Sequence, residues 1–190
     1  MCNEVGGIQD QISSAFGGLN LIEFSKNGYD VHSVQLSKRR KLDFQTNLML
    51  FYTKIQRTSS EIQKKIKTPG EINKNLLTLK HLAIEGYECL TNEKQNLDDF
   101  GQILNEAWKS KKGLSDAVTT SFIDECYVKG LEAGALGGKV LGAGGGGFLL
   151  FYVPYSRQEA VRNALSDLIE IKFCFEEQGS QILLNFKDDL

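Results

Sequence analysis

Glycines dominate the stretch of this 190-residue sequence with the strongest chemical signature. Eight of the nineteen glycines lie between Gly134 and Gly147, and the run Gly142-Ala143-Gly144-Gly145-Gly146-Gly147 leads directly into the apolar segment 148–153. Ordering so much glycine costs conformational entropy, because glycine has the most freedom to lose. Such a loop against a core strand is typical of backbone that closely approaches another group, most often a phosphate or a second glycine loop.

Two common nucleotide-binding motifs are excluded by the order of residues and elements. The run satisfies Gly-x-Gly-x-x-Gly, but the dinucleotide-binding motif needs a strand before it and a helix after it. Here we expect a helix before the run and a strand after it. Phe148 occupies the position of the lysine that a P-loop requires. A plain helix-to-strand turn and a functional loop remain, and we favour the loop because a turn needs only one or two glycines.

One carboxylate is placed for acid–base chemistry. Asp10 follows a glycine pair and is flanked by Gln9 and Gln11, whose amides can orient it. Phosphoryl transfer to an alcohol needs positioning, charge neutralisation and a carboxylate that accepts the hydroxyl proton. The alternative is an ordinary aspartate near a helix N-terminus, where the helix dipole favours it. On the residues alone, that alternative is the better interpretation.

Two cations are candidates for binding an anion. Arg57 follows an apolar strand and precedes a helix, and Lys139 lies beside the glycine run. Their alternatives are a surface arginine and a lysine that shields the turn. His32 and His81 are isolated and the cysteines lack Cys-x-x-Cys spacing, so we expect no metal site and no catalytic triad.

The flanking sequence predicts the elements that position these residues. Apolar residues at helical spacing indicate three helices between residues 72 and 126. Strand-like segments occupy residues 20–24, 29–36, 47–53, 148–153, 172–177 and 181–186. We expect strand 47–53 to be buried on both faces. The order indicates an α+β fold with helices on one face of a mainly antiparallel sheet.

Composition narrows the class of protein further. A net charge of −2 gives no electrostatic basis for a nucleic-acid partner, and we expect the short basic cluster 38–41 to be a solvated loop. No apolar stretch reaches the roughly 18 residues that span a membrane. The N-terminus lacks the features of a secretory signal. We therefore expect a cytoplasmic protein with no membrane partner.

Two separated motifs carry a family likeness. Segment 138–148 resembles the C-terminal glycine motif of the GHMP small-molecule kinases. Segments 7–11 and 15–20 are similar to the catalytic-aspartate region of the sugar-kinase branch, above all the D-glycero-D-manno-heptose 7-phosphate kinases. Tyr52-Thr53, Arg57-Thr58-Ser59 and Trp108-Lys109-x-Lys111-Lys112 also look like that branch.

The resemblance implies a kinase that uses ATP and Mg²⁺ on a sugar or sugar phosphate, here the anomeric hydroxyl of D-glycero-D-manno-heptose 7-phosphate. Asp10 would accept the proton, and Gln9, Gly17, Gly18 and Arg57 would bind the substrate. Lys139 and the run from Gly142 to Gly147 would support the nucleotide phosphate loop. The same resemblance implies a ferredoxin-like C-terminal domain at residues 45–190, and a remnant of a ribosomal-protein-S5-like N-terminal domain at residues 1–44.

Members of this family also carry a preceding segment with a Pro-x-x-x-Gly-Leu-Gly-Ser-Ser-like phosphate loop, which has no counterpart in this sequence. We therefore expect the chain to be inactive alone, and to be a C-terminal fragment, a truncated gene product, or one half of a split enzyme whose partner is a separate N-terminal kinase half. One alternative is a non-catalytic module, derived from a kinase, that binds a metabolite or a partner chain. Another is a ferredoxin-like RNA-binding domain, although the basic surface of such domains is lacking.

Overall fold

The computed structural model describes residues 8–56 and 69–182, with side chains in helix α4 from Lys74 onward. Contacts within the chain divide it into two compact units. The described part of the larger unit comprises residues 36–56 and 69–173, and that of the smaller unit comprises residues 8–35 and 174–182. The domain boundary predicted between residues 44 and 45 stays a prediction.

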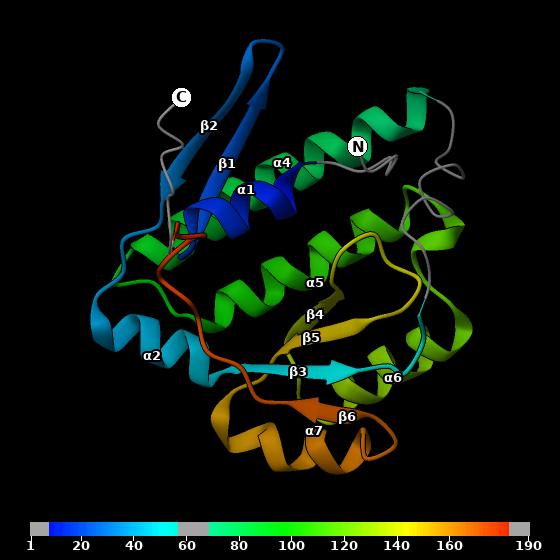
Figure 1. The fold of residues 1–190 in the computed structure, drawn as a ribbon. Coiled ribbons are helices and arrows are strands. Elements are labelled where there is room, and N and C mark those ends of the chain that lie inside the picture. Colours follow the sequence, from blue (N-terminus) through cyan, green and yellow to red (C-terminus); the bar gives the residue numbers. More distant parts are fainter. Residues whose placement is uncertain (1–7, 57–68, 183–190) are drawn as a thin grey trace, which may run out of the picture. The chain divides into compact units, whose positions relative to one another are not determined.

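The larger unit is built around a four-stranded antiparallel sheet in the order β4-β5-β3-β6 (Figure 1). Its elements in chain order are α2 (Lys38–Thr46), β3 (Leu48–Tyr52), α4 (Pro69–Thr91), α5 (Asp98–Lys112), η1 (Asp116–Val118), α6 (Ser121–Glu132), β4 (Gly137–Val140), β5 (Phe148–Tyr152), η2 (Tyr155–Arg157), α7 (Gln158–Ala164) and β6 (Ile169–Ile171). From β3 onward the order is strand, helices, two strands, helix, strand, which is the ferredoxin-like arrangement. The predicted α+β fold is confirmed.

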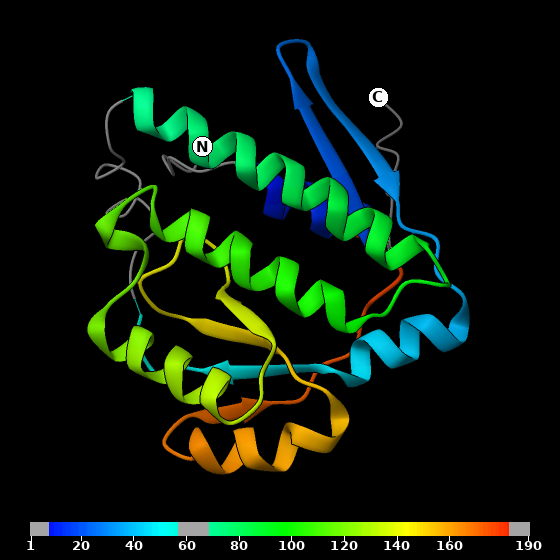
Figure 2. The same cartoon turned by 180° about the vertical axis from the view of Figure 1, so that it is seen from behind.

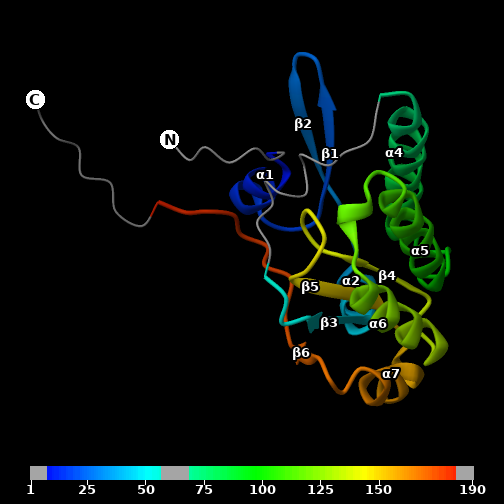
Figure 3. The same cartoon turned by 90° about the vertical axis from the view of Figure 1, so that its right-hand side faces the viewer.

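Alternation along the strands decides which face of this sheet is covered. Phe51 of β3 and Leu149 and Phe151 of β5 are fully buried, and Tyr127 of α6 stacks on Phe151 with ring centroids 5.6 Å apart. Helices α4 to α7 lie on this side of the sheet, as Figures 2 and 3 show from two directions. The alternate residues of β3 are only partly buried. The expectation that this strand is buried on both faces is therefore wrong, because the helices of this unit cover one face.

The glycine run lies in a β-hairpin and not directly after a helix. Helix α6 ends at Glu132, and β4 intervenes, with Val140 paired to Leu149 of β5. The sequence pattern missed β4 because Gly137 and Gly138 carry no side chains to alternate. A Cβ on Gly137 would overlap the carbonyl oxygen of Gly101 in α5, so these glycines let the helix pack closely on the strand. The dinucleotide-binding motif stays excluded, since a strand follows the run.

The basic cluster at residues 38–41 is not a solvated loop. It forms the first turn of α2, where the Ser37 hydroxyl accepts a hydrogen bond from the amide of Arg40. The Arg40 guanidinium is buried and donates to the carbonyl oxygens of Cys89, Leu90 and Gln95, at 2.6 to 3.0 Å. The guanidinium therefore supplies hydrogen-bond donors to carbonyl oxygens in the last turn of α4 and just after it, where amide donors from the helix are lacking. Charge density alone could not reveal this, because the partners lie about fifty residues away in the sequence.

The smaller unit contains α1 (Gln9–Phe16) and a hairpin of β1 (Asn20–Ser25) and β2 (Gly28–Ser33). This confirms the first two predicted strands. Segment 174–182 belongs to the same unit: the Glu176 carbonyl accepts from the Gly18 amide, and the Ser14 carbonyl accepts from the Ser180 amide, at 2.8 and 2.9 Å.

The predicted hairpin of strands 172–177 and 181–186 differs from the structure. The last described strand is β6, at residues 169–171, and residues 172–182 form no ladder. Residues 183–186 lie outside the described part of the chain. Segment 174–182 bonds to the end of α1 instead, and sequence periodicity does not record that choice of partner.

None of the described helices combines the length and the apolar character that a membrane crossing requires.

Candidate functional site

The glycine loop, residues 142–147, connects β4 to β5 (Figure 1, yellow) and is held to its surroundings at three points. At its start, the Nζ atom of Lys111 donates to the carbonyl oxygen of Gly142 at 2.6 Å and to that of Val140 at 3.4 Å. Lys111 lies in the last turn of α5. The same helix that packs on β4 therefore supplies the cation at the beginning of the loop.

The middle of the loop rests on the short helix η1. The Gly145 amide donates to the carbonyl oxygen of Val118 at 2.7 Å. Gly144 has φ +102°, and a Cβ at this position would lie 2.5 Å from the same oxygen. This position therefore requires glycine on two grounds, the left-handed backbone and the close approach.

The end of the loop is joined to the segment after β3. The Gly147 amide donates to the carbonyl oxygen of Ile55 at 2.8 Å, and both the amide and the hydroxyl of Thr53 donate to the Gly147 carbonyl, at 2.9 and 2.8 Å. Lys54 between them has φ +62°, the one left-handed residue other than glycine among those described. This turn directs the Ile55 carbonyl oxygen toward the loop. Left-handed backbone in a residue with a side chain is a form of strain that concentrates at functional sites.

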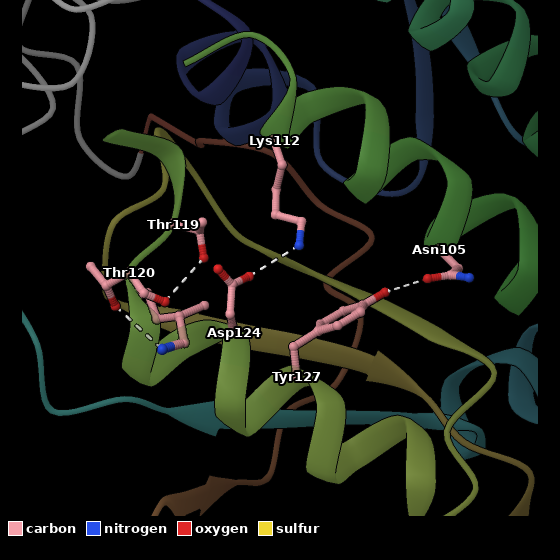
Figure 4. Close-up of polar contacts among 7 residues, drawn as sticks. Asn105, Lys112, Thr119, Thr120, Asp124 and Tyr127 are labelled. Atoms are coloured by element: carbon pink, nitrogen blue, oxygen red, sulfur yellow. Dashed lines mark hydrogen bonds and ion pairs between the residues drawn. The ribbon is translucent and has the colours of Figure 1, made fainter. Parts of the chain in front are cut away.

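Polar side chains join α5 to α6, the two helices that flank η1. Figure 4 shows the Lys112 ammonium at the end of α5 pairing with Asp124 in the first turn of α6, at 3.1 Å. The Thr120 hydroxyl caps α6 by accepting from the Ile123 amide at 3.3 Å. One turn further on, the Tyr127 hydroxyl donates to Asn105 of α5 at 2.8 Å. The Lys112–Asp124 and Tyr127–Asn105 contacts join α5 to α6.

Burial keeps two ionisable side chains of α6 in their neutral forms. Desolvation raises the pKa of Tyr127 to about 12, against a smaller lowering by a backbone hydrogen bond with Gly138. Burial likewise raises the pKa of the Cys126 thiol on the same helix. Both groups are therefore neutral at ordinary pH, and their roles are packing and hydrogen bonding.

The loop offers its backbone amides to an anion. Among the residues that the structure describes, the amides of Ala143 and Gly144 have no hydrogen-bond partner and these residues are partly exposed, whereas the amides of Gly145 and Gly147 are satisfied. Successive amides in alternating backbone conformations form concavities that bind phosphate and other anions. The three anchors fix the direction of these amides. The arrangement is suited to contacting a phosphate group or a phosphate-binding loop.

The predicted site residues fall into two groups in different compact units. Gln9 and Asp10 are exposed in the first turn of α1, and Gly17 and Gly18 follow its end, all in the smaller unit. The glycine loop and Lys139 belong to the larger unit. Lys139 lies within β4, paired with Leu150, and not in the loop itself. Arg57 lies outside the described residues. The roles given to these residues stay predictions.

Three residues that anchor the loop were not among the predicted site residues. Thr53, Lys111 and Val118 are separated from the glycine run by between 24 and 94 positions in the sequence. A signal was present for two of them, since Tyr52-Thr53 and Trp108-Lys109-x-Lys111-Lys112 belong to the segments that resemble the sugar-kinase branch. No spacing rule connects them to the loop.

The fold and the loop together define a class of protein. It is a ferredoxin-like domain with a glycine loop in its β4–β5 hairpin, held by hydrogen bonds to neighbouring elements. Residues 88–170 match the family model described as GHMP kinases C terminal, and this range contains α5, α6, the glycine loop and α7. The chain therefore contains a GHMP kinase C-terminal domain, as the sequence predicts.

Curated and solved proteins place the chain beside heptose phosphate kinases. It is 33% identical over 168 residues to the D-glycero-alpha-D-manno-heptose 7-phosphate kinase of Campylobacter jejuni, covering 85% of this chain and 48% of that protein. A D-glycero-D-manno-heptose 1-phosphate kinase from Bacteroides thetaiotaomicron superposes with a TM-score of 0.65 at 27% identity, over 92% of this chain and 48% of that one. A sugar kinase structure from Campylobacter jejuni gives a TM-score of 0.69 at 28% identity, over 94% and 51%. The chain thus spans about half the length of these relatives.

Proposed function

We propose that the chain is the C-terminal portion of an ATP-dependent sugar-phosphate kinase that acts on the anomeric hydroxyl of D-glycero-D-manno-heptose 7-phosphate. The observation that carries the proposal is the 33% identity to a heptose 7-phosphate kinase over 168 residues, which covers 85% of this chain. The reaction passes the terminal phosphoryl group of ATP to a sugar oxygen, and the proton of that hydroxyl leaves to a base.

In this proposal the residues of the smaller unit act on the sugar. The Asp10 carboxylate accepts the hydroxyl proton as the oxygen attacks phosphorus, and Gln9 orients that carboxylate. Gly17 and Gly18 let the backbone approach the substrate. Arg57, which is not part of the smaller unit and lies outside the described residues, would neutralise charge on the substrate phosphate. The exposure of Asp10 supports this role, since a base must be reachable by the alcohol.

The larger unit acts on the nucleotide side. The unpartnered amides of Ala143 and Gly144 support contact between the glycine loop and a phosphate-bearing partner. Lys139 adds positive charge beside the loop. Bound ATP would supply the phosphoryl group and Mg²⁺ would neutralise its charge. Among the described residues no cluster of three His, Cys, Asp or Glu side chains is able to hold a metal, so we assign no protein ligand to Mg²⁺.

We further propose that turnover needs the portion of the kinase that this chain does not span, supplied as a partner chain or by fusion. That portion would carry the main ATP phosphate loop at the N-terminus of a helix. Among the described residues, the glycine run is followed by strand β5 and not by such a helix. The free thiols of Cys89 and Cys126 are compatible with the cytoplasm, the compartment that we assign to the enzyme.

The experiment combines this chain with the N-terminal half of the Campylobacter jejuni relative, mixed or fused, and measures ATP-dependent phosphorylation of heptose 7-phosphate. We expect activity only in the combination, and a fall of about a hundredfold or more in kcat for Asp10→Asn, which keeps the size but not the basicity of the side chain. Asp30→Asn is the matched control, since Asp30 is exposed on β2 of the same unit. Equal turnover by wild type and Asp10→Asn would remove Asp10 as the base.

The identity of the substrate is tested in the same assay. Heptose 7-phosphate should be consumed at least tenfold more efficiently, in kcat/KM, than the sugar without its phosphate, because the phosphate supplies charged contacts that an uncharged hydroxyl does not. Equal use of both sugars would contradict the assignment to a sugar phosphate. Binding of the sugar without phosphoryl transfer in any combination would favour the non-catalytic module instead.

A further inference from the structure

Two carbonyl oxygens lie where β4 turns into the glycine loop, and one side chain contacts both. The Lys111 ammonium is 2.6 Å from the Gly142 oxygen and 3.4 Å from the Val140 oxygen. Val140 is fully buried, whereas Gly142 is exposed. The lysine thus reaches from the end of α5 to the boundary between the core strand and the exposed loop.

The start of the loop has less support from packing than its middle. A Cβ on Gly142 would meet no atom within 4 Å, whereas Cβ atoms on Gly144 and Gly146 would press against the oxygens of Val118 and Ile55. Packing therefore fixes the middle of the loop but leaves Gly142 in open space at φ +64°. The contact with Lys111 is a charge-assisted hydrogen bond, the stronger kind, at the position where packing is weakest.

The ammonium also changes the electrostatics of the loop. Carbonyl oxygens carry partial negative charge and repel a phosphate, whereas amides attract it. A cation bound to the oxygens of Val140 and Gly142 offsets that repulsion. The amides of Ala143 and Gly144, which follow directly, then dominate the local field.

We propose that Lys111 is a positioning residue for the glycine loop: it holds Gly142 in its left-handed conformation and neutralises the two carbonyls, so that the amides that follow are presented to phosphate. The consequence for catalysis rests on the proposed kinase function. The conformational part does not, since it concerns this chain alone.

The conformational part is tested by amide hydrogen exchange in the full chain. We compare Lys111→Met, which removes the charge but keeps the chain length, with Lys111→Arg and with Lys109→Met. Lys109 lies on the same helix and pairs with Glu106 on the surface, where an ion pair contributes little. In Lys111→Met, exchange of the Leu141 and Gly145 amides, which flank this part of the loop and donate to Phe148 and Val118, should rise about tenfold while exchange in α6 and β5 stays unchanged. Exchange rates in Lys111→Arg should stay within about threefold of those in wild type, and exchange rates in Lys109→Met should equal those in wild type.

Unchanged exchange of the Leu141 and Gly145 amides in Lys111→Met would overturn the proposal. A uniform increase throughout the larger unit would overturn it too, because the lysine would then only stabilise the fold. Activity in the combined enzyme gives a second readout: Lys111→Met should lower kcat about tenfold with the KM for the sugar phosphate within about threefold, and arginine should restore most of kcat. A combined enzyme without any kinase activity would refute the proposed function and leave the exchange result to decide the role of Lys111.

Discussion

Gly144 and Gly146 place their backbones against the carbonyl oxygens of Val118 and Ile55, and Gly147 shares its own carbonyl with two donors from Thr53. The glycine loop is therefore shaped by backbone atoms of its neighbours. This explains the glycines at positions 144 and 146, where main chain already occupies the space that a side chain would fill; at Gly142 and Gly147 the space is open and the left-handed backbone is what favours glycine.

The glycines of the loop should differ in their tolerance to alanine. Gly144→Ala combines left-handed strain with a Cβ 2.5 Å from the Val118 oxygen, so we expect a loss of about 3 kcal/mol in the free energy of unfolding. Gly142→Ala is the matched control, because it also has positive φ but no atom within 4 Å of the added Cβ, and should cost about 1 kcal/mol. Urea titration followed by Trp108 fluorescence measures both. Equal losses would show that the close approach contributes nothing.

Tyr127 should make stability depend on alkaline pH. Its pKa in the folded protein is raised to about 12 by burial, above the ordinary value near 10, so folding favours the neutral phenol. This contribution is fully present below about pH 10 and is lost as the pH rises through about 12. The stability difference between wild type and Tyr127→Phe should therefore shift by about 1 kcal/mol against wild type between pH 9 and pH 11.

Urea titrations of both proteins across that pH range give the difference directly. Tyrosines common to both proteins cancel in the comparison. At pH 7 the variant should be less stable by about 1 kcal/mol, because the Asn105 oxygen loses its donor. Curves that stay parallel up to pH 11 would contradict the burial of this hydroxyl in the folded state.

At the scale of elements, α2 and α4 are joined by a buried cation and not by an apolar stripe. Arg40 contacts three carbonyl oxygens at and after the end of α4. Helices α5 and α6 are joined by Lys112–Asp124 and Tyr127–Asn105, and α7 is fastened to edge strand β6 by the paired contacts of Arg162 with Glu170. Polar contacts between elements thus add to the apolar core in fixing how the helices pack.

Removing the Arg40 contacts should weaken the larger unit. Arg40→Met leaves three carbonyl oxygens without their charged donor, and we expect a loss of about 3 kcal/mol in the free energy of unfolding. Arg39→Met is the control on the neighbouring residue, whose side chain is 93% exposed and pairs with Asp43 at 3.7 Å; it should change stability by no more than about 0.5 kcal/mol. Thermal or urea unfolding measures both variants. Similar behaviour of the two would refute a structural role for Arg40.

At the scale of the whole molecule, the two compact units use the chain differently. The described residues of the larger unit, 36–56 and 69–173, all come from the middle of the chain, whereas the smaller unit joins residues near the start of the chain to residues near its end. Backbone hydrogen bonds of Gly18 with Glu176 and of Ser14 with Ser180 close the smaller unit. The segment with Asp10 thus depends on residues more than 150 positions away.

Truncation after Phe173 should destabilise the smaller unit while leaving the stability of the larger unit nearly unchanged. The larger unit keeps all of its elements, and the single tryptophan of the chain, Trp108, is fully buried within it. We therefore expect the tryptophan fluorescence transition in urea to move by less than about 1 kcal/mol, while hydrogen exchange in α1 and the β1–β2 hairpin rises at least tenfold. Unchanged exchange in α1 would show that segment 174–182 does not support the smaller unit.

The sequence by itself determined what depends on local pattern and on the identity of residues. The glycine run, the periodic helices and the hairpin of β1 and β2 follow from neighbours in the chain, and the separated motifs indicated the GHMP kinase family. The α+β order with one covered sheet face follows from the same information. The expected roles of Asp10, Gln9, Arg57 and Lys139 come from the resemblance and stay predictions.

Only the tertiary structure decided how the glycine loop is held. Lys111, Val118 and Thr53 meet the loop through contacts between distant elements, and two of these contacts use carbonyl or amide atoms that every residue possesses, so no side-chain pattern marks them. Arg40 was misinterpreted for the same reason, since its partners are carbonyls at the end of another helix. Strand β4 escaped detection because its glycines leave no alternation, although their lack of side chains is what lets α5 pack against it.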